Sequence, residues 1–299
     1  MKTIKQLAII GSTASGKTSL SIKLAHKINA HILSLDSLAI YKEIDIVSAK
    51  PSMKERDTIR HFGLDMILPN ENFDVSTFIK LYHEVYAHCQ KEGKNLIIVG
   101  GTSFYLKMLI EGISQIPTIS QSTQDLCSSH LQNLEKTYQW LSSLDPHYMS
   151  SIASKDRYRI EKALQLYLQT SLIPTEYFRQ NPPKPTITAP LPIYQIVWER
   201  EQLRQRISQR SHIMLKQGLI DEICMLEKKY TRTPNCMKSI GIKETLAYLD
   251  GKYDKKTLIE KISTNTARLA KRQTTFNNSQ FKILNKGSLE EFERVLLMR

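Results

Sequence analysis

The stretch that most restricts the fold of this chain runs from Gly11 to Thr18 and reads G-x-x-x-x-G-K-T. An apolar run at residues 7–10 precedes it as a buried strand should, and apolar residues with helical spacing follow it as far as Ile28. A strand, a glycine-rich loop and a helix in this order form the setting in which the motif binds phosphate. We therefore expect an α/β fold whose first strand ends in a phosphate-binding loop.

The loop residues are candidates for holding a phosphate or a diphosphate. Glycines let the backbone curl until its N–H groups converge on phosphate oxygens, and the helix N-terminus adds partial positive charge. Lys17 supplies a full charge, and the Thr18 hydroxyl can coordinate Mg²⁺, the cofactor we expect. The predicted binding residues are Gly11, Ser12, Thr13, Ala14, Ser15, Gly16, Lys17 and Thr18.

Strand and helix patterns alternate after the loop. Apolar runs at 31–36 and 96–99 predict strands of a parallel sheet, with helices between them that include residues 53–60 and one starting at Asp74 or Ser76. We expect a P-loop NTPase-like core with a helical insertion and a helical C-terminal region. The predicted segments are 1–115 for the first part of the core, 116–192 for the insertion, and 193–299 for the rest, with a helix at 239–248 and a last strand at 281–284.

Two polar residues follow strands that lie beside the loop in this scheme. Asp36 ends one strand, where open α/β sheets place their ligands, and its carboxylate could bind Mg²⁺, act as a general base, or only cap the turn after it. Thr102 follows the strand at 96–99 and could orient a substrate or cap the next helix. That strand ends in Gly-Gly-Thr rather than in the Asp that ATPases and GTPases with this loop use.

Basic residues concentrate in the last third of the chain. The formal net charge is +13, and residues 200–299 hold 21 Lys and Arg against 11 Asp and Glu. This balance indicates a polyanionic partner, although a lysine-rich surface alone would give the same numbers. Arg206 and Arg210 lie one helical turn apart and could clamp a diphosphate or a nucleic-acid backbone, or face solvent. Residues 270–276 combine basic, amide and aromatic side chains that suit RNA.

The start of the chain shows no signal-peptide pattern, and no apolar run approaches membrane-spanning length. We expect a cytoplasmic protein without membrane contact. The four cysteines form no C-x-x-C pair, and no His pair follows them at the spacing of a zinc finger, which argues for reduced thiols and against zinc.

Seven stretches taken in order resemble the bacterial tRNA dimethylallyltransferase (tRNA isopentenyltransferase) family, among them a loose match of the family's R-A-L-E to residues 159–164. The family pattern G-P-T-A-S-G-K-T matches the loop with Ser12 in place of Pro, and D-S-x-x-x-Y-x-x-x-D-I-G-T-A-K-P matches 36–51 with Val47 and Ser48 in place of Gly-Thr. G-G-T-x-x-Y-L matches 100–106.

The remaining matches lie in the C-terminal third. R-x-x-x-R-x-x-x-M-x-x-x-G-L-x-x-E runs from Arg206 to Glu222, I-G-Y-K-E matches 240–244, and A-K-R-Q-x-T-W matches 270–276 with Phe276 in place of Trp.

The resemblance implies a reaction and assigns roles. A dimethylallyl group moves from dimethylallyl diphosphate to the N6 amine of the adenosine 3′ of the anticodon, in tRNAs that read codons beginning with U. Asp36 takes the proton, Thr102 holds the base, and Lys17 and Arg206 hold the diphosphate with Mg²⁺. We expect a monomer that binds the anticodon stem-loop. The implied tRNA-binding residues are Asp36, Ser37, Leu38, Ala39, Thr102, Arg159, Lys243, Lys271, Arg272 and Gln273.

Two alternatives use the same loop. One is an ATP-binding small-molecule kinase, which has no need of a basic C-terminal third. The other is an RNA-binding protein with a nucleotide site and no chemistry. A substrate assay with tRNA separates all three.

Overall fold

The computed structural model describes residues 4–56, 58–282 and 285–297. The chain forms two compact units, one made of Met1–Leu109 with Ile187–Arg299 and the other of Ile110–Thr186. The second unit overlaps the predicted insertion at 116–192. Since each unit has its own core, the two are described separately.

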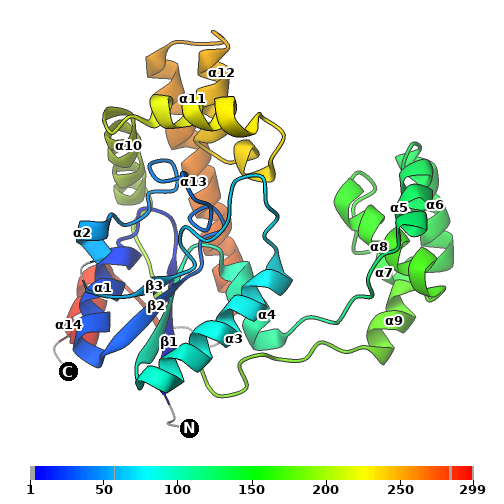
Figure 1. Ribbon diagram of the computed structural model, residues 1–299, viewed down its shortest axis with the longest axis horizontal. Helices are drawn as coiled ribbons and strands as arrows, with labels where there is room; N and C mark the ends of the chain where they lie inside the picture. Colours follow the sequence, from blue (N-terminus) through cyan, green and yellow to red (C-terminus); the bar gives the residue numbers. More distant parts are fainter. Residues whose placement is uncertain (1–3, 57, 283–284, 298–299) are drawn as a thin grey trace. The chain divides into compact units, whose positions relative to one another are not determined.

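A six-stranded sheet forms the centre of the first unit (Figure 1). Its strand order is β3-β2-β4-β1-β5-β6, and every neighbouring pair is parallel, which confirms the predicted α/β class. The strands are β1 (Gln6–Gly11), β2 (Ala30–Ser34), β3 (His61–Phe62), β4 (Asn95–Gly100), β5 (Ile193–Ile196) and β6 (Asn285–Gly287).

The register of the sheet brings three chain turns to one edge. Ile10 of β1 pairs with Gly100 of β4, Gly11 pairs with Ile196 of β5, and Ser34 of β2 pairs with Val99 of β4. The carboxyl ends of β1, β2 and β4 therefore lie side by side. The phosphate loop and the residues that follow β2 and β4 meet there, as expected for an open parallel sheet.

Helices cover the sheet because its strands are apolar on both faces. Helix α1 (Lys17–Ile28) packs with α14 (Leu289–Leu297), and α3 (Val75–Glu92) packs against β2 and β4. Helix α4 (Ser103–Glu111) follows β4. Asp74 caps α3 by accepting a hydrogen bond from the Thr77 N–H, as predicted.

The helix predicted at 53–60 is too long. Helix α2 spans only Met53–Arg56, and the Arg60 carbonyl accepts a hydrogen bond of 3.0 Å from the Ile32 N–H. Residue 60 is therefore extended beside β2, and His61 begins β3. Pairing with the sheet overrides the local preference for helix.

Four helices make up most of the C-terminal region: α10 (Arg200–Lys216), α11 (Leu219–Tyr230), α12 (Ile242–Leu249) and α13 (Lys255–Gln280). The long α13 packs against α10 and reaches β1. The predicted start of α12 at 239 is wrong, because a 3₁₀ turn (Asn235–Lys238) and Gly241 at φ +94° precede it. The last strand lies at Asn285–Gly287; of the prediction 281–284, residues 281 and 282 are not in a strand and 283–284 lie outside the described residues.

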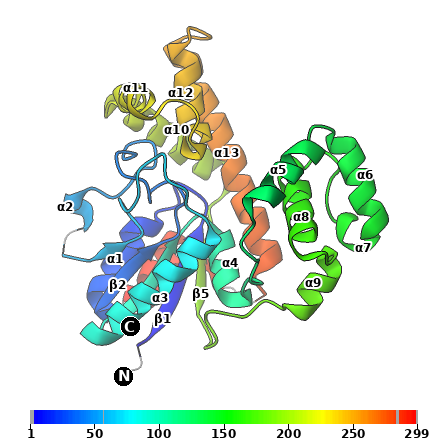
Figure 2. The ribbon, with the colours of Figure 1, turned by 45° about the vertical axis from the view of Figure 1, so that its right-hand side comes forward.

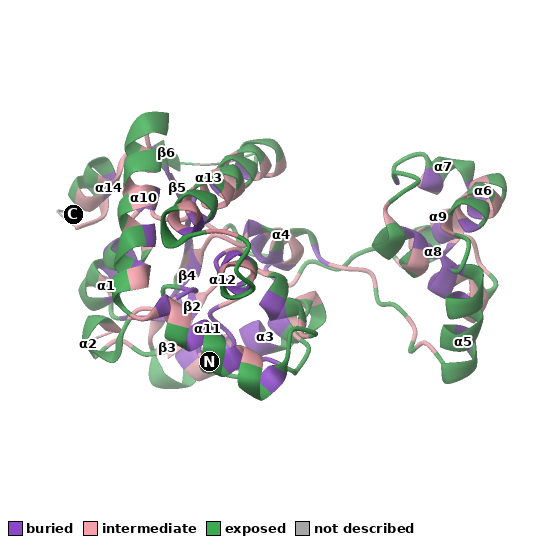
Figure 3. Ribbon diagram, turned by 90° about the horizontal axis from the view of Figure 1, so that it is seen from above, coloured by how far each residue is buried: buried purple, intermediate pink, exposed green. Residues whose placement is uncertain are grey.

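The second unit is helical, as expected for the insertion (Figure 2). Its helices are α5 (Gln121–His130), α6 (Leu134–Leu144), α7 (Pro146–Met149), α8 (Arg157–Thr170) and α9 (Pro174–Gln180). Leu141, Met149, Ile160 and Leu164 form the centre of its own core, and the buried stretch of α8 is visible in Figure 3. Among the described residues of the whole chain, we find no helix with the length and apolar character needed to cross a membrane.

Candidate active site

The phosphate loop requires glycine at two positions. Gly11 has φ +155°, and a Cβ there would lie 2.9 Å from the Ile196 carbonyl oxygen of β5. Gly16 has φ +91°, and a Cβ would lie 2.8 Å from the Leu289 side chain of α14. These two contacts fix the loop between the sheet and a helix.

Lys17 is held inside the loop. Its ammonium donates hydrogen bonds to the Ser12 carbonyl (2.5 Å) and to Ser15 Oγ (3.3 Å). Burial and, to a smaller extent, the positive charge of Arg210 lower the pKa of Lys17 to about 7, while the negative charge of Asp36 acts in the opposite direction. Lys17, Arg210 and Asp36 therefore share one electrostatic environment.

Helix α10 faces the loop with both of its predicted arginines. Arg206 Nε donates to the Ala14 carbonyl (2.8 Å), and its guanidinium lies 4.4 Å from the centre of the Trp198 ring. Arg210 Nη1 donates to Thr13 Oγ1 (3.0 Å). The solvent-facing alternative for this pair is therefore wrong, and both guanidinium groups are available to an anion in the loop.

Gln273 of α13 joins the phosphate loop to the turn after β4. Its Oε1 accepts from the Thr13 N–H (2.9 Å), and its Nε2 donates to the Gly101 carbonyl (3.1 Å). A Cβ at position 101 would lie 2.5 Å from this Nε2, and one at Gly100 would lie 2.6 Å from the Leu35 carbonyl oxygen. Close packing against the backbone thus requires glycine at position 100, the last residue of β4, and Gly101 leaves room for the Gln273 side chain. Gln273 was predicted to bind tRNA; the structure adds a bracing role, and the tRNA contact stays a prediction.

Asp36 and Thr102 order the segment after β2. Asp36 Oδ1 accepts from the Leu38 N–H (2.8 Å) and the Ala39 N–H (3.2 Å), and Thr102 Oγ1 accepts from the Ser37 N–H (3.2 Å). Asp36 Oδ2 has no hydrogen-bond partner in the described part of the chain. The capping alternative for Asp36 is thus observed for one oxygen, while the other remains open to a ligand.

Two cavities adjoin at this segment. One, of about 600 Å³, is lined by the phosphate loop, and the other, of about 650 Å³, by side chains of α13, the turn after β4 and the segment before α12. Thr18 lines the first, and Lys243, Arg272, Thr102 and Phe104 line the second. The residues that line both are Thr13, Asp36, Ser48, Gly101, Arg210 and Gln273. Asp36 therefore stands where a group bound at the phosphate loop can meet a group entering from the other side.

Two predicted tRNA-binding residues are not among those that line these cavities. Lys271 lines a separate groove of about 760 Å³ between α10 and α13, with Trp198 and three arginines. Arg159 belongs to α8 of the second unit, where it pairs with Asp156 at 3.5 Å.

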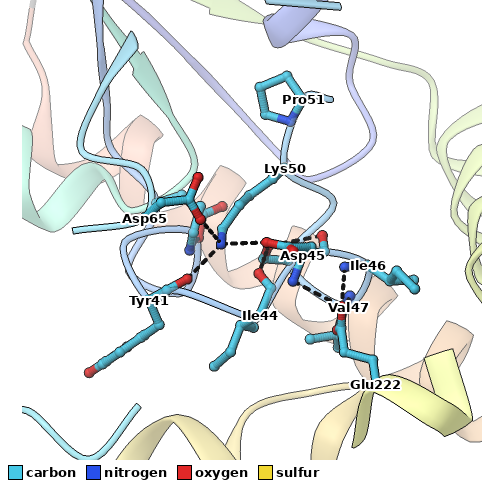
Figure 4. Close-up of polar contacts among 12 residues, drawn as sticks. Tyr41, Ile44, Asp45, Ile46, Val47, Lys50, Pro51, Asp65 and Glu222 are labelled. Carbon is cyan, nitrogen blue, oxygen red and sulfur yellow. Dashed lines mark hydrogen bonds and ion pairs between the residues drawn. The ribbon is translucent and has the colours of Figure 1, made fainter. Parts of the chain in front are cut away.

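A framework that sequence reasoning did not identify supports the segment 41–51 (Figure 4). Glu222 of α11 accepts from the N–H groups of Asp45 (3.0 Å), Ile46 (2.7 Å) and Val47 (3.0 Å). In the sequence, the signal that could have identified Glu222 is its position at the end of the motif that begins at Arg206. Gly241 also belongs to the framework, since a Cβ there would lie 2.4 Å from Val47 Cγ2.

Lys50 completes the framework. Its ammonium donates to the Tyr41 carbonyl (2.6 Å), Asp45 Oδ1 (2.7 Å) and Asp65 Oδ1 (2.6 Å), so all three of its N–H bonds are used within the protein.

Comparison with known proteins places this geometry in a family. The family model described as IPP transferase matches residues 39–280. A tRNA dimethylallyltransferase from Sulfurovum sp. (strain NBC37-1) is 64% identical over 294 residues, which cover 98% of each chain.

Solved structures agree with this match. The full-length tRNA isopentenylpyrophosphate transferase from Bacillus halodurans is 26% identical with a TM-score of 0.71, over 99% of this chain and 95% of that one. A eukaryotic dimethylallyltransferase acting on tRNA is 25% identical with a TM-score of 0.84, over 98% of this chain and 77% of that one. With the phosphate loop, the Asp36 junction and these matches together, the chain belongs to the IPP transferase family, the family of the tRNA dimethylallyltransferases.

Proposed function

We propose that the chain transfers a dimethylallyl group from dimethylallyl diphosphate to the N6 amine of the adenosine 3′ of the anticodon, in tRNAs that read codons beginning with U. The observation that carries the proposal is the position of Asp36, which lines both the phosphate-loop cavity and the adjoining cavity. An alkyl donor and a nucleophile that enter from opposite sides meet at this carboxylate.

The phosphate loop holds the leaving group. In the transfer, the bond between the allylic carbon and the diphosphate oxygen breaks, and negative charge builds on the diphosphate. Lys17, Arg206 and Arg210 face that oxygen-rich group with the backbone N–H groups of the loop, and they stabilise the developing charge. The Thr18 hydroxyl lines this cavity and is a hard oxygen ligand, which suits Mg²⁺; the ion, when bound, neutralises diphosphate charge.

The nucleophile is the adenine amine, whose lone pair is delocalised into the ring. As the C–N bond forms, the nitrogen loses a proton and Asp36 Oδ2 accepts it; the proposal is supported by the hydrogen bonds of Leu38 and Ala39, which both go to Oδ1 and leave Oδ2 without a partner in the described chain. Thr102, which lines the second cavity, lies beside Asp36 through Ser37 and can orient the base.

The second cavity suits RNA. Lys243 and Arg272 supply positive charge, and Phe104, 46% exposed, offers a face for stacking. The adenosine must leave its stack to enter this cavity, at a cost of a few kcal/mol that phosphate contacts elsewhere offset. Arg159 and Lys271 are proposed as such contacts.

A paired labelling experiment tests the proposal. The protein is mixed with tRNA and either labelled dimethylallyl diphosphate or labelled ATP, with Mg²⁺. We expect label on tRNA from the first donor and no nucleotide consumption from the second. Phosphate transfer from ATP to a small molecule would support the kinase alternative, and tRNA binding without label transfer would support the non-catalytic one.

A further inference from the structure

Three metal-ligating side chains cluster between α3 and β2, the strand next to the edge strand β3, apart from the phosphate loop. His31 lies on β2, and His88 and Glu92 lie on α3. The ligand atoms of these three residues are all within 4.8 Å of one another. Since His88 and Glu92 are one helical turn apart, both point toward the strand that α3 covers.

Glu92 bridges the two imidazole rings. One carboxylate oxygen lies 2.6 Å from His31 Nε2 and the other 3.0 Å from His88 Nε2. The His31 side chain is only 10% exposed, so its ring is held in place, and Phe62 packs with its edge against both histidine rings. The two Nε2 atoms are therefore aimed at one carboxylate from fixed positions.

The hydrogen bonds of this cluster cannot all be satisfied. His88 Nε2 lies 3.0 Å from Glu92 Oε1, which only accepts, and 3.0 Å from Arg60 Nη1, which only donates. If His88 Nε2 carries a proton, it can donate to Glu92, but it faces the N–H donor of Arg60. If it carries no proton, it can accept from Arg60, but its lone pair faces the carboxylate oxygen of Glu92. A cation bound to the Nε2 lone pair and to the carboxylate removes the conflict at Glu92. Arg60, whose side chain is 56% exposed, would then turn toward solvent and give up its ion pair with Glu92 Oε1 (4.0 Å) and its position 4.9 Å from the centre of the Phe62 ring.

We propose that His31, His88 and Glu92 form a binding site for a divalent transition metal of the zinc type. Two imidazoles and a carboxylate are a donor set that Zn²⁺ accepts, with a solvent molecule as fourth ligand. Tetrahedral bonds of about 2.0–2.2 Å need ligand atoms near 3.4 Å apart, which small side-chain rotations reach from the observed separations. Bound metal links β2 to α3 and so fastens this strand of the sheet to the helix that covers it.

The site is independent of the proposed transferase activity. It uses none of the residues assigned to diphosphate, Mg²⁺ or tRNA, and its test needs no substrate. A purified chain stripped with a chelator is titrated with Zn²⁺ by calorimetry and with Co²⁺ by visible absorption, because tetrahedral Co²⁺ has intense bands. The wild type should bind one ion and should unfold at a higher temperature with Zn²⁺ than without.

Three variants make the test specific. Glu92→Gln should weaken Zn²⁺ binding by at least the 10–100-fold that even outer-shell losses cause. His83→Ala is the matched control, because His83 is an exposed histidine on the same helix and lies outside the cluster. Arg60→Ala should tighten binding, since it removes the competing cation beside His88. Equal Zn²⁺ affinity in the wild type and Glu92→Gln, or weaker binding in Arg60→Ala, would overturn the proposal.

Discussion

Replacing Asp36 with Asn separates the turn-capping role that the structure shows for this carboxylate from the general-base role proposed for it. Asp36 Oδ1 accepts from the N–H groups of Leu38 (2.8 Å) and Ala39 (3.2 Å), and an amide oxygen can accept the same two bonds. The second oxygen, which we propose takes the proton of the adenine amine, becomes an NH₂ group that cannot accept a proton. Asp36→Asn should therefore keep the turn and lose the base.

The expected loss of rate follows from the role. General base catalysis contributes about 10²–10⁴-fold, which corresponds to about 2.7–5.4 kcal/mol of activation free energy. Single-turnover transfer from labelled dimethylallyl diphosphate to tRNA measures this loss directly. The dissociation constant for tRNA should change little, because the hydrogen bonds to the segment 37–39 remain.

Asp36→Ala is the control for the turn. Asp36→Ala removes both hydrogen bonds as well as the proposed base, so its free energy of unfolding should fall by about 0.5–1.5 kcal/mol for each bond lost. The free energy of unfolding of Asp36→Asn should not fall in this way. If Asp36→Asn transfers the dimethylallyl group at the wild-type rate, the carboxylate is not the base and its role is confined to the turn.

Three further predictions concern charge. Because burial and Arg210 lower the pKa of Lys17 to about 7, diphosphate binding at pH 8 should take up nearly one proton, measured by calorimetry in buffers of different ionisation enthalpy; Lys17→Arg should take up none. In the unfolded chain Lys17 keeps its proton up to its usual pKa of 10.5, whereas in the folded chain it loses the proton near pH 7. The contribution of Lys17 to the free energy of unfolding therefore rises between about pH 7 and 10.5. In Lys17→Arg this rise of the unfolding temperature with pH should be absent, which would support the assignment. Glu222→Gln should lower the unfolding free energy by about 1.5–3 kcal/mol for the one charged-acceptor bond lost, and an unchanged thermal midpoint would contradict the framework role. Lys243→Ala and Lys271→Ala should each reduce the salt dependence of tRNA binding by about 0.7–0.9 log units per log unit of salt, and an unchanged slope removes that lysine from the interface.

The sheet and the phosphate loop were predictable because their causes are local. An apolar run before a glycine-rich loop and a periodic run after it specify strand, turn and helix within a short window. The end of α2 was not predictable in this way. Its last turn is lost because Arg60 bonds to Ile32, a partner 28 positions away, and local propensity carries no information on that pairing.

The candidate site shows the same division. Lys17, Asp36 and Arg206 could be selected from motif and spacing, and the structure places all three on the same cavity. The bracing role of Gln273 depends on two partners, 260 and 172 positions away, that only the folded chain brings together. Lys271 lines the groove between α10 and α13 rather than the two adjoining cavities, and this depends on which side of α13 faces α10.

Lys50 shows why a motif alone does not tell a ligand from a support. It lies in a matched motif beside the phosphate-loop cavity, and a lysine there suggests a phosphate contact. Yet its side chain is 3% exposed, and its three N–H bonds go to Tyr41, Asp45 and Asp65. Lys17 has two acceptors from the loop itself, and a diphosphate can replace them without unpairing a carboxylate. Moving Lys50 to a phosphate would leave two carboxylates without this cation, so of the two lysines we propose Lys17 as the anion ligand, whereas Lys50 supports the segment 41–51.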